Sequence, residues 1–134
     1  MTPFDLKIVT PDGLIFEGQA EEVIVRSTSG DIGILAGHLN CVAPLGMGRA
    51  TIIIDGQKRY AACIGGMLSV VNGAVTLVPT TFEWADKIDA ERAEASYQRA
   101  QTTLQDKNAT ETDIKLAEAR LRRSLVRKNV ASMK

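Results

Sequence analysis

The sequence predicts an α+β protein, in which an N-terminal antiparallel β-sandwich of about eight to ten strands precedes a C-terminal antiparallel two-helix hairpin. Residues 1–84 are rich in Val, Ile, Thr and Gly, and turn dipeptides interrupt them at short intervals, which is typical of strands. Glycine is absent from residue 86 onward, where Ala, Glu, Arg, Gln and Leu predominate. The 134 residues are 45% hydrophobic, which is enough for a packed core. We therefore expect a sandwich domain over residues 1–85 and a helical domain over residues 86–134.

Tight hairpin turns punctuate the first domain. The dipeptides Asp12-Gly13, Asp55-Gly56 and Asn72-Gly73 supply residues that tolerate positive φ, which the two-residue hairpin turn requires. Apolar runs flank the last two dipeptides directly, in RATIIIDGQKRYAACI and SVVNGAVTLV. Further short strands fit DLKIVT, LIFEGQ, EEVIVRST and CVAPLG, so strands recur about every 8 to 12 residues. This spacing favours an antiparallel sandwich or barrel, and the run ATIIID indicates a strand that is buried on both faces.

The spacing of apolar residues after residue 86 predicts two helices. The first helix has an apolar stripe at Ala93, Tyr97, Ala100 and Leu104. The second begins at TETD, where Thr110 and Asp113 form an imperfect capping box. Its apolar stripe comprises Ile114, Ala117, Leu121 and Leu125. Because only the short stretch QDKNA separates the helices, they should lie antiparallel. Both stripes are narrow, so the hairpin should be only marginally stable by itself.

Charge and motif content exclude several function classes. Sixteen basic residues balance sixteen acidic ones, so we expect no nucleic-acid partner. No signal-peptide pattern is present, and no apolar run approaches the roughly 20 residues of a membrane-spanning helix, so we expect a soluble protein. Cys41 and Cys63 should be reduced thiols packed as small apolar side chains. His38 is the only histidine and has no accompanying nucleophile or metal motif, so we expect no catalytic residue and no metal site.

The stretch KIDAERAEA, at the start of the first helix, has two interpretations. Asp89 and Arg92 lie three residues apart in the first turn, where an ion pair that caps a helix is ordinary. Arg92 and Arg99 are also nearly in line beside small side chains, which would leave room for a ligand carrying phosphates. A basic cluster on the second helix comprises Arg120, Arg123 and Arg127. This cluster is either a solvated face or a set of groups that pair with phosphates or with an acidic neighbour.

One segment of the sequence matches a motif that is typical of a known protein family. Residues 29–45 read SGDIGILAGHLNCVAPL, which resembles the epsilon subunit of the F-type ATP synthase. That family typically carries GxxGILPGH at this place, and the chain matches it except that Ala36 stands where proline is usual. The segments TPDG, GGMLSV, VTLV and IDAERA follow the family's order and spacing. The chain is therefore identified as a member of this family over nearly its whole length.

The resemblance implies a non-catalytic subunit of the rotor's central stalk, peripheral at the cytoplasmic face of a bacterial plasma membrane. The synthase would translocate protons or sodium ions. The expected partners are the gamma subunit and the c-subunit ring, together with the alpha and beta catalytic subunits when the hairpin is extended. The family's contact with the c ring corresponds to Thr28, Ser29, Gly30 and Asp31. His38 would face gamma, and the hairpin would regulate ATP hydrolysis.

The resemblance also implies an ATP site in the hairpin. In bacterial members the motif Ile or Leu, Asp, two variable residues, Arg, Ala marks a site for one ATP, and here it comprises Ile88, Asp89, Arg92 and Ala93. Glu83 precedes this motif by five residues, as in members that bind ATP. Arginines at or near the family's phosphate-binding positions are Arg99, Arg123 and Arg127. No cofactor is required, and ATP is expected as a regulatory ligand. The alternative is a free-standing ATP-sensing domain without a rotor, which would have no reason to keep GDIGILAGH.

Overall fold

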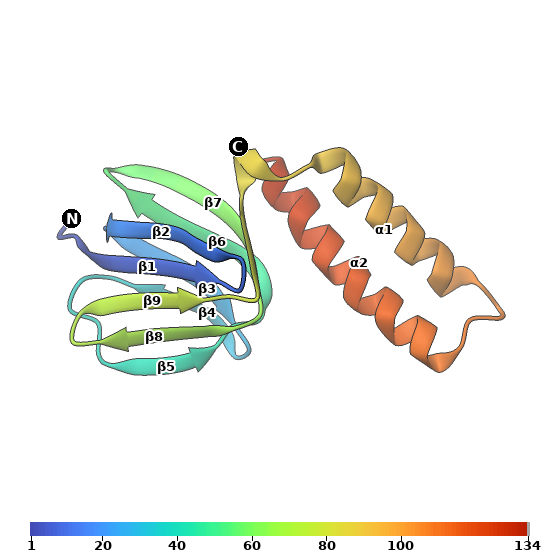
Figure 1. The fold of residues 1–134 in the computed structure, drawn as a ribbon, viewed down its shortest axis with the longest axis horizontal. Coiled ribbons are helices and arrows are strands. Elements are labelled where there is room, and N and C mark those ends of the chain that lie inside the picture. The colour runs from blue at the N-terminus through green and yellow to red at the C-terminus, as the bar shows by residue number, and fades with distance from the viewer. Residues whose placement is uncertain (134) are drawn as a thin grey trace.

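The computed structural model describes residues 1–133 and shows two stacked β-sheets with a helical hairpin at one end (Figure 1). The first sheet contains, in spatial order, β2 (Gly13–Ala20), β1 (Phe4–Thr10), β9 (Ala74–Val78), β8 (Met67–Val71) and β5 (Cys41–Pro44). The second contains β10 (Thr81–Trp84), β7 (Gln57–Ile64), β6 (Met47–Ile54), β3 (Glu22–Ser27) and β4 (Gly30–Ile34). The helical part comprises the 3-10 helix η1 (Ala85–Lys87), α1 (Ala90–Gln105) and α2 (Glu111–Ala131). The predicted α+β class, a sandwich followed by a hairpin, is confirmed.

One strand pair departs from the expected antiparallel arrangement. β1 and β9 run parallel, with Leu6 opposite Val75 and Ile8 opposite Leu77. The direction of β9 follows from its tight hairpin with β8, and this direction makes it parallel to β1 when the two strands meet. Sequence periodicity carries no information about such a long-range pairing.

The sandwich core lies between the two sheets and follows the period of two expected of strands. In β1 the side chains of Leu6 and Ile8 are buried, whereas Asp5 and Lys7 are exposed. The buried members of this core all fall between Phe4 and Phe82 in the sequence. The core of the sandwich therefore needs no residue from the two helices.

β6 and β7 are buried on both faces near their ends. Ala50 and Ile52 of β6 join the sandwich core, and Thr51 and Ile53 are buried as well, so the expectation for ATIIID is confirmed. In β7 all four residues from Ala61 to Ile64 are buried. The hairpin accounts for part of this, since Ala62 belongs to a second apolar cluster that includes residues of α2.

The predicted turn dipeptides lie at hairpin turns, but they do not all adopt one geometry. Asp55 and Asn72 have φ of 52° and 50°, and the glycines after them also have positive φ. These values fit the mirror-image type I turn that matches strand twist. At the first dipeptide only Gly13 has positive φ, at 126°, and the β1–β2 ladder shifts register between Ile8 and Val9. Thr10 pairs with Gly13, so the two-residue loop here is Pro11-Asp12, and the proline ring excludes the positive φ that the mirror-image turn needs at its first central residue.

Both helices begin with side-chain caps. Asp89 Oδ1 accepts a hydrogen bond of 3.0 Å from the backbone N–H of Arg92. At α2 the Thr110 side chain accepts from the N–H of Asp113, and the Asp113 carboxylate accepts from the N–H of Thr110, each at 3.1 Å. The box that the sequence predicts as imperfect is therefore complete.

The seam between α1 and α2 is made of small side chains. The buried residues along it are Ala93, Ala100, Ala117 and Ser124. The expected stripe of α2 is wrong at its last member, because Leu125 is 43% exposed and Ser124 is buried instead. The predicted stripe runs in steps of four from Ala117 through Leu121 to Leu125. Four residues advance 400° around a helix, so each step moves the side chain further round the helix and away from the seam. A step of three from Leu121 instead leads to Ser124, which faces the seam again.

A small apolar cluster joins the hairpin to the sandwich. Its buried members are Ala62 on β7, Ala85 in η1, Ile88 directly after η1, and Val130 and Ala131 at the end of α2. Figure 1 shows the hairpin extending away from the sandwich from this contact. Among the helices of residues 1–133, none is long and apolar enough to cross a membrane.

Candidate functional site

The basic cluster of α2 opens onto a cavity of about 310 Å³ between the hairpin and the edge of the second sheet. Its lining residues are Ile64, Thr81, Glu83, Ser96, Arg120, Arg123, Ser124 and Arg127. Three arginines oppose a single carboxylate among these residues, so the cavity carries a net positive charge. The hydroxyls of its Ser and Thr residues add groups that donate hydrogen bonds. This combination is suited to an anion with several oxygen atoms.

Helical spacing brings the three arginines together. Arg120, Arg123 and Arg127 are three and four residues apart, so they share one face of α2. Arg127 pairs with Glu83 of β10, with Nη2 donating to Oε2 at 3.1 Å and Nε at 2.8 Å from Oε1. The Nε contact is an ion pair whose angle does not satisfy a hydrogen bond. Within residues 1–133, Arg120 and Arg123 have no carboxylate at ion-pair distance, so their guanidinium groups are available to a ligand.

The structure places the four residues of the predicted ATP motif in four different environments. Ile88 is 4% exposed and packs in the cluster that joins the hairpin to the sandwich. Asp89 caps α1, and Ala93 is fully buried in the helix seam. Arg92 and Arg99 are exposed and do not line the cavity. However, they lie four residues before and three residues after Ser96, which does line it, so they share a face of α1 with a lining residue.

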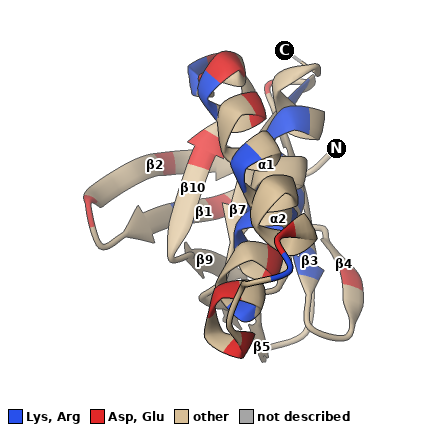
Figure 2. Ribbon diagram, turned by 90° about the vertical axis from the view of Figure 1, so that its right-hand side faces the viewer, with Lys and Arg blue, Asp and Glu red and all other residues tan. Residues whose placement is uncertain are grey.

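Five of the eight lining residues were not in the predicted ATP site, namely Ile64, Thr81, Ser96, Arg120 and Ser124. Thr81 and Ser96 have no sequence motif that marks them, although Ser96 follows Arg92 by one helical turn. Arg120 belongs to the basic cluster but is not in the ATP site that the resemblance implies. Arg120 could have been included in the predicted ATP site, because helical spacing puts it on the same face as Arg123 and Arg127. Figure 2 shows basic and acidic residues interspersed along both helices, so the net charge of the cavity is local.

The residues predicted to meet other subunits occupy two separate places. Thr28 and Ser29 form the turn between β3 and β4, and Gly30 begins β4 with φ of 125°. Asp31 follows on β4 and accepts a hydrogen bond of 2.7 Å from Arg26 Nε. His38 lies in the loop after β4, where its Nδ1 is 2.7 Å from the carbonyl oxygen of Leu39. The five residues of β4 separate the two places by about 16 Å.

An exposed apolar surface lies on the outer face of the first sheet. Val42, Met67, Val71 and Val78 are large side chains that point away from the core, and each is at least 42% exposed. The His38 loop continues this surface, with Leu39 83% exposed. The loop is tied to the sheet because the Asn72 N–H donates to Asn40 Oδ1 at 2.8 Å. Exposed apolar groups that gather on one face are typical of a protein contact.

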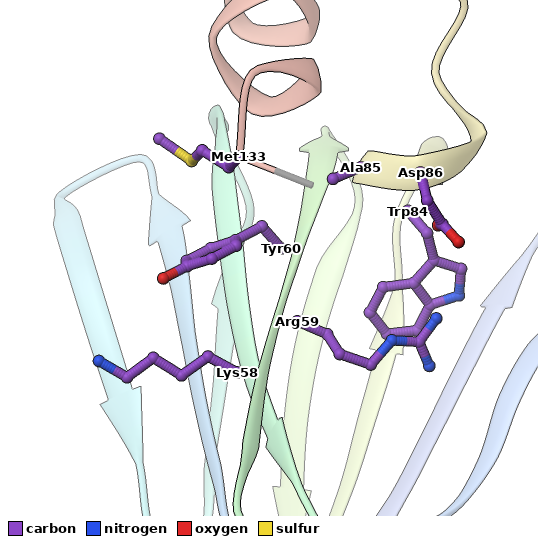
Figure 3. Close-up of a pocket in the computed structure, with 7 residues that line it drawn as sticks. All are labelled: Lys58, Arg59, Tyr60, Trp84, Ala85, Asp86 and Met133. Carbon is purple, nitrogen blue, oxygen red and sulfur yellow. The ribbon is translucent and has the colours of Figure 1, made fainter.

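A second, smaller cavity of about 160 Å³ lies where the end of α2 meets β7 and β10. Lys58 and Tyr60 point to one side of β7 and Arg59 to the other, and Met133 lies above Tyr60 (Figure 3). The guanidinium of Arg59 stacks on the Trp84 ring at 3.8 Å from its centroid. This contact already occupies the cation and the aromatic face, and it joins β7 to β10 within the sandwich. Among the described residues, no group of three or more His, Cys, Asp or Glu is placed to hold a metal ion.

Comparison with known proteins gives matches over both halves of the chain. The family model for the β-sandwich domain of the ATP synthase Delta/Epsilon chain matches residues 3–85. The model for the long alpha-helix domain of the same chain matches residues 86–132. The ATP synthase epsilon chain of Bacillus velezensis is 44% identical over 131 residues, which cover 98% of each chain. The epsilon chain of Bacillus cytotoxicus is 41% identical over 134 residues and covers both chains completely.

The fold is also found among solved structures. A chain in the mitochondrial ATP synthase of Euglena gracilis superimposes with a TM-score of 0.84, covering 100% of this chain and 83% of that one. The two sequences are only 21% identical. This likeness therefore shows a shared fold.

Proposed function

The chain belongs to the ATP synthase Delta/Epsilon chain family, and we propose that it is a non-catalytic epsilon subunit in the rotor's central stalk. The observation that carries this proposal is that both halves match domains of one family in the right order, over residues 3–85 and 86–132. The subunit would be peripheral at the cytoplasmic face of a bacterial plasma membrane. A free-standing sensor remains the competing proposal.

The apolar outer face of the first sheet is an argument for a contact with another subunit, which we take to be gamma. Val42, Val71 and the neighbouring Leu39 would exchange contact with water for contact with gamma. The Thr28–Asp31 turn, at the other end of β4, would be offered to the polar loops of the c ring. Its one charged residue, Asp31, already pairs with Arg26 of β3. Polar groups of this kind contribute specificity more than affinity.

Co-purification from the native host tests this assignment. A tagged chain should bring down gamma, and Val42→Asp with Val71→Asp should abolish this because two charges would enter an apolar contact. Leu116→Asp is the matched control, since Leu116 is 60% exposed on α2, away from the sheet. Recovery of the tagged chain alone from the native host would favour the free-standing sensor.

The cavity supports a second part of the proposal, in which ATP binds between the hairpin and the sandwich. The phosphates would pair with Arg123, Arg127 and Arg120 and with Arg92 and Arg99 from α1, and Glu83 would hold Arg127 in position. A ligand that prefers the docked hairpin stabilises it by RT ln(1 + [L]/Kd), or about 2.7 kcal/mol at a hundredfold excess over Kd. When ATP falls, the hairpin would extend toward the alpha and beta subunits and block hydrolysis.

Calorimetric titration with ATP tests this site. Arg92→Ala and Arg123→Ala should each lose a charge-assisted hydrogen bond and weaken binding by about tenfold or more. Asp89→Ala should also weaken it, because Asp89 fixes the start of α1 and so the place of Arg92. Arg122→Ala is the control, since Arg122 lines a different groove beside Thr28 and Leu45. No heat at millimolar ATP, or the same affinity in all variants, would leave Asp89 as a helix cap alone.

A further inference from the structure

Two consecutive basic residues near the end of α2 pair with different parts of the molecule. Arg127 pairs with Glu83 of β10, in the sandwich. Lys128 pairs with Glu94 of α1, with Nζ 2.5 Å from Oε2, and also lies 4.0 Å from the centroid of the Tyr97 ring. Consecutive helical residues point about 100° apart, which lets neighbours face two different surfaces. One ion pair therefore connects the hairpin to the sandwich, and the other connects its two helices.

The contact between hairpin and sandwich is small. Three of its five buried apolar residues are alanines, and Ile88 and Val130 are its largest buried members. Hydrophobic stabilisation scales with the apolar area that is removed from water, so small side chains contribute little. Within residues 1–133 one ion pair crosses this contact, Glu83 with Arg127, and it is about one quarter to one third exposed and partly screened by solvent.

The contact between the helices is longer. It runs from Ala93 to Ala100 on α1 and from Ala117 to Ser124 on α2, and these four residues are buried. Small side chains let two helix backbones approach closely and gain dispersion contacts along their length. Lys128 then closes the seam at its end nearest the sandwich, where its ammonium has both a carboxylate and an aromatic face.

The electrostatic surroundings of Glu94 agree with this geometry. The hydrogen bonds from Lys128 and then Gln98 lower the pKa of the Glu94 carboxyl below its ordinary value. The ionised form is therefore the one that the closed hairpin favours.

We propose that the hairpin leaves the sandwich as an intact helix pair, and that Lys128 keeps this pair closed after Glu83 and Arg127 have separated. The undocking of the hairpin from the sandwich and the separation of its two helices are then two steps. The first breaks the contact between Glu83 and Arg127, and the second breaks the contacts of Lys128. This inference goes beyond the proposed regulation by ATP, because it concerns contacts within the chain and needs no nucleotide. Its consequence is that a compact but undocked hairpin is a distinct state of the subunit.

NMR spectroscopy of the full chain without nucleotide tests the order of the steps. The variant Glu83→Gln with Ile88→Ser removes the ion pair between β10 and α2 and the largest buried apolar side chain of the small cluster that joins the hairpin to the sandwich. We expect loss of the NOEs between α2 and β7, and a shorter rotational correlation time for the hairpin amides than for the sandwich. The NOEs between Lys128 and Tyr97 should remain. Loss of these NOEs together with those to β7, or continued docking of the hairpin, would overturn the proposal.

A further substitution in this undocked variant tests the part played by Lys128. Lys128→Met should remove the NOEs between the two helices, whereas the control Lys115→Met, at an exposed position of α2, should leave them. Exchanging the two charges, with Glu94→Lys and Lys128→Glu, should restore them. Persistence of these NOEs after Lys128→Met, or failure of the exchanged pair to restore them, would overturn the role of Lys128. The sandwich resonances in each spectrum show whether that domain is still folded.

Discussion

Gly66 lies where the chain turns between the two sheets, and a side chain has no room there. It has φ of 93°, and a Cβ built on it would lie 2.0 Å from the carbonyl oxygen of Val78. The obstructing atom belongs to the backbone, so no rotamer change can relieve the clash. Gly33, on β4, offers a contrast, because a Cβ there would meet nothing within 4 Å.

Gly66→Ala should therefore destabilise the sandwich strongly, by about 2 kcal/mol or more, through strain at positive φ and displacement of β9. Gly33→Ala should change the free energy of unfolding by no more than about 0.5 kcal/mol. Urea unfolding followed by tryptophan fluorescence of Trp84 measures both. Equal stability of the two variants would contradict the close approach at Gly66.

The two cysteines differ in environment and should differ in reactivity. Burial raises the pKa of the Cys63 thiol to about 12, so almost none of it is thiolate at neutral pH. Cys41, on the edge strand β5, is only partly buried. In the folded protein a thiol reagent such as iodoacetamide should label Cys41 and leave Cys63 unlabelled, whereas both should react in urea. Mass spectrometry of the peptides measures this, and rapid labelling of Cys63 in the folded state would contradict it.

α2 has a narrow apolar face, since Leu116 and Leu125 are exposed and only Val130 and Ala131 are buried in the cluster at the sandwich. Its start is fixed by the reciprocal bonds between Thr110 and Asp113. Its far end is held by Arg127 and Lys128. These contacts at the two ends supplement the narrow apolar face that α2 packs against its neighbours.

Loss of the cap should fray the beginning of α2. Thr110→Ala removes the acceptor for the Asp113 N–H and should cost about 1 kcal/mol of helix stability. The control Thr112→Ala lies in the exposed first turn outside the capping box. Hydrogen exchange of the first-turn amides should accelerate in the first variant only. Equal exchange in both would show that the box does not stabilise the helix.

The pair of Glu94 and Lys128 predicts a pH dependence for the hairpin. Because the folded-state pKa of Glu94 is lowered, the pair contributes stability above the ordinary pKa of a Glu carboxyl. This contribution is lost as pH falls through the lowered folded-state pKa, on the acid side of the ordinary pKa of a Glu carboxyl. Amide shifts of α1 and α2 should report loosening in that range, and Lys128→Met should remove this part of the titration. An unchanged titration in Lys128→Met would contradict the pairing.

On the scale of the whole molecule, two bodies with separate cores meet at a small contact. The sandwich core is built between Phe4 and Phe82, with the ring of Trp84 packed against it. The chain then leaves the sandwich through η1 and Ile88. Such an arrangement lets the hairpin move while the sandwich keeps its structure.

A chain ending at residue 85 should accordingly fold by itself. Truncation exposes Ala62 and Tyr60 on β7 but removes no member of the sandwich core. We expect a single cooperative unfolding transition, with near-UV circular dichroism and tryptophan fluorescence changing together. It should also still bind gamma, because the apolar outer face is on the other sheet. Aggregation or a broad transition would mean that the hairpin is needed for the fold.

Features governed by neighbours in the chain were predictable from the sequence alone. The turns at Asp55 and Asn72, the caps at Asp89 and Thr110, and the two helices all depend on hydrogen bonds or periods within a few residues. The family resemblance added the candidate ATP motif. It also named Glu83, Arg123 and Arg127, three of the residues around one cavity.

Only the tertiary structure decided how distant segments meet. It pairs β1 with β9 in parallel, buries Ser124 in place of Leu125, and separates His38 from the Thr28 turn by the length of β4. It also joins Glu83 to Arg127 across 44 residues of sequence. The physical reason is that local hydrogen bonds and periodicity specify which element forms and which face is apolar. Which elements lie side by side is decided when the two sheets stack and the hairpin docks on them. Both events depend on the shape and packing of the whole chain.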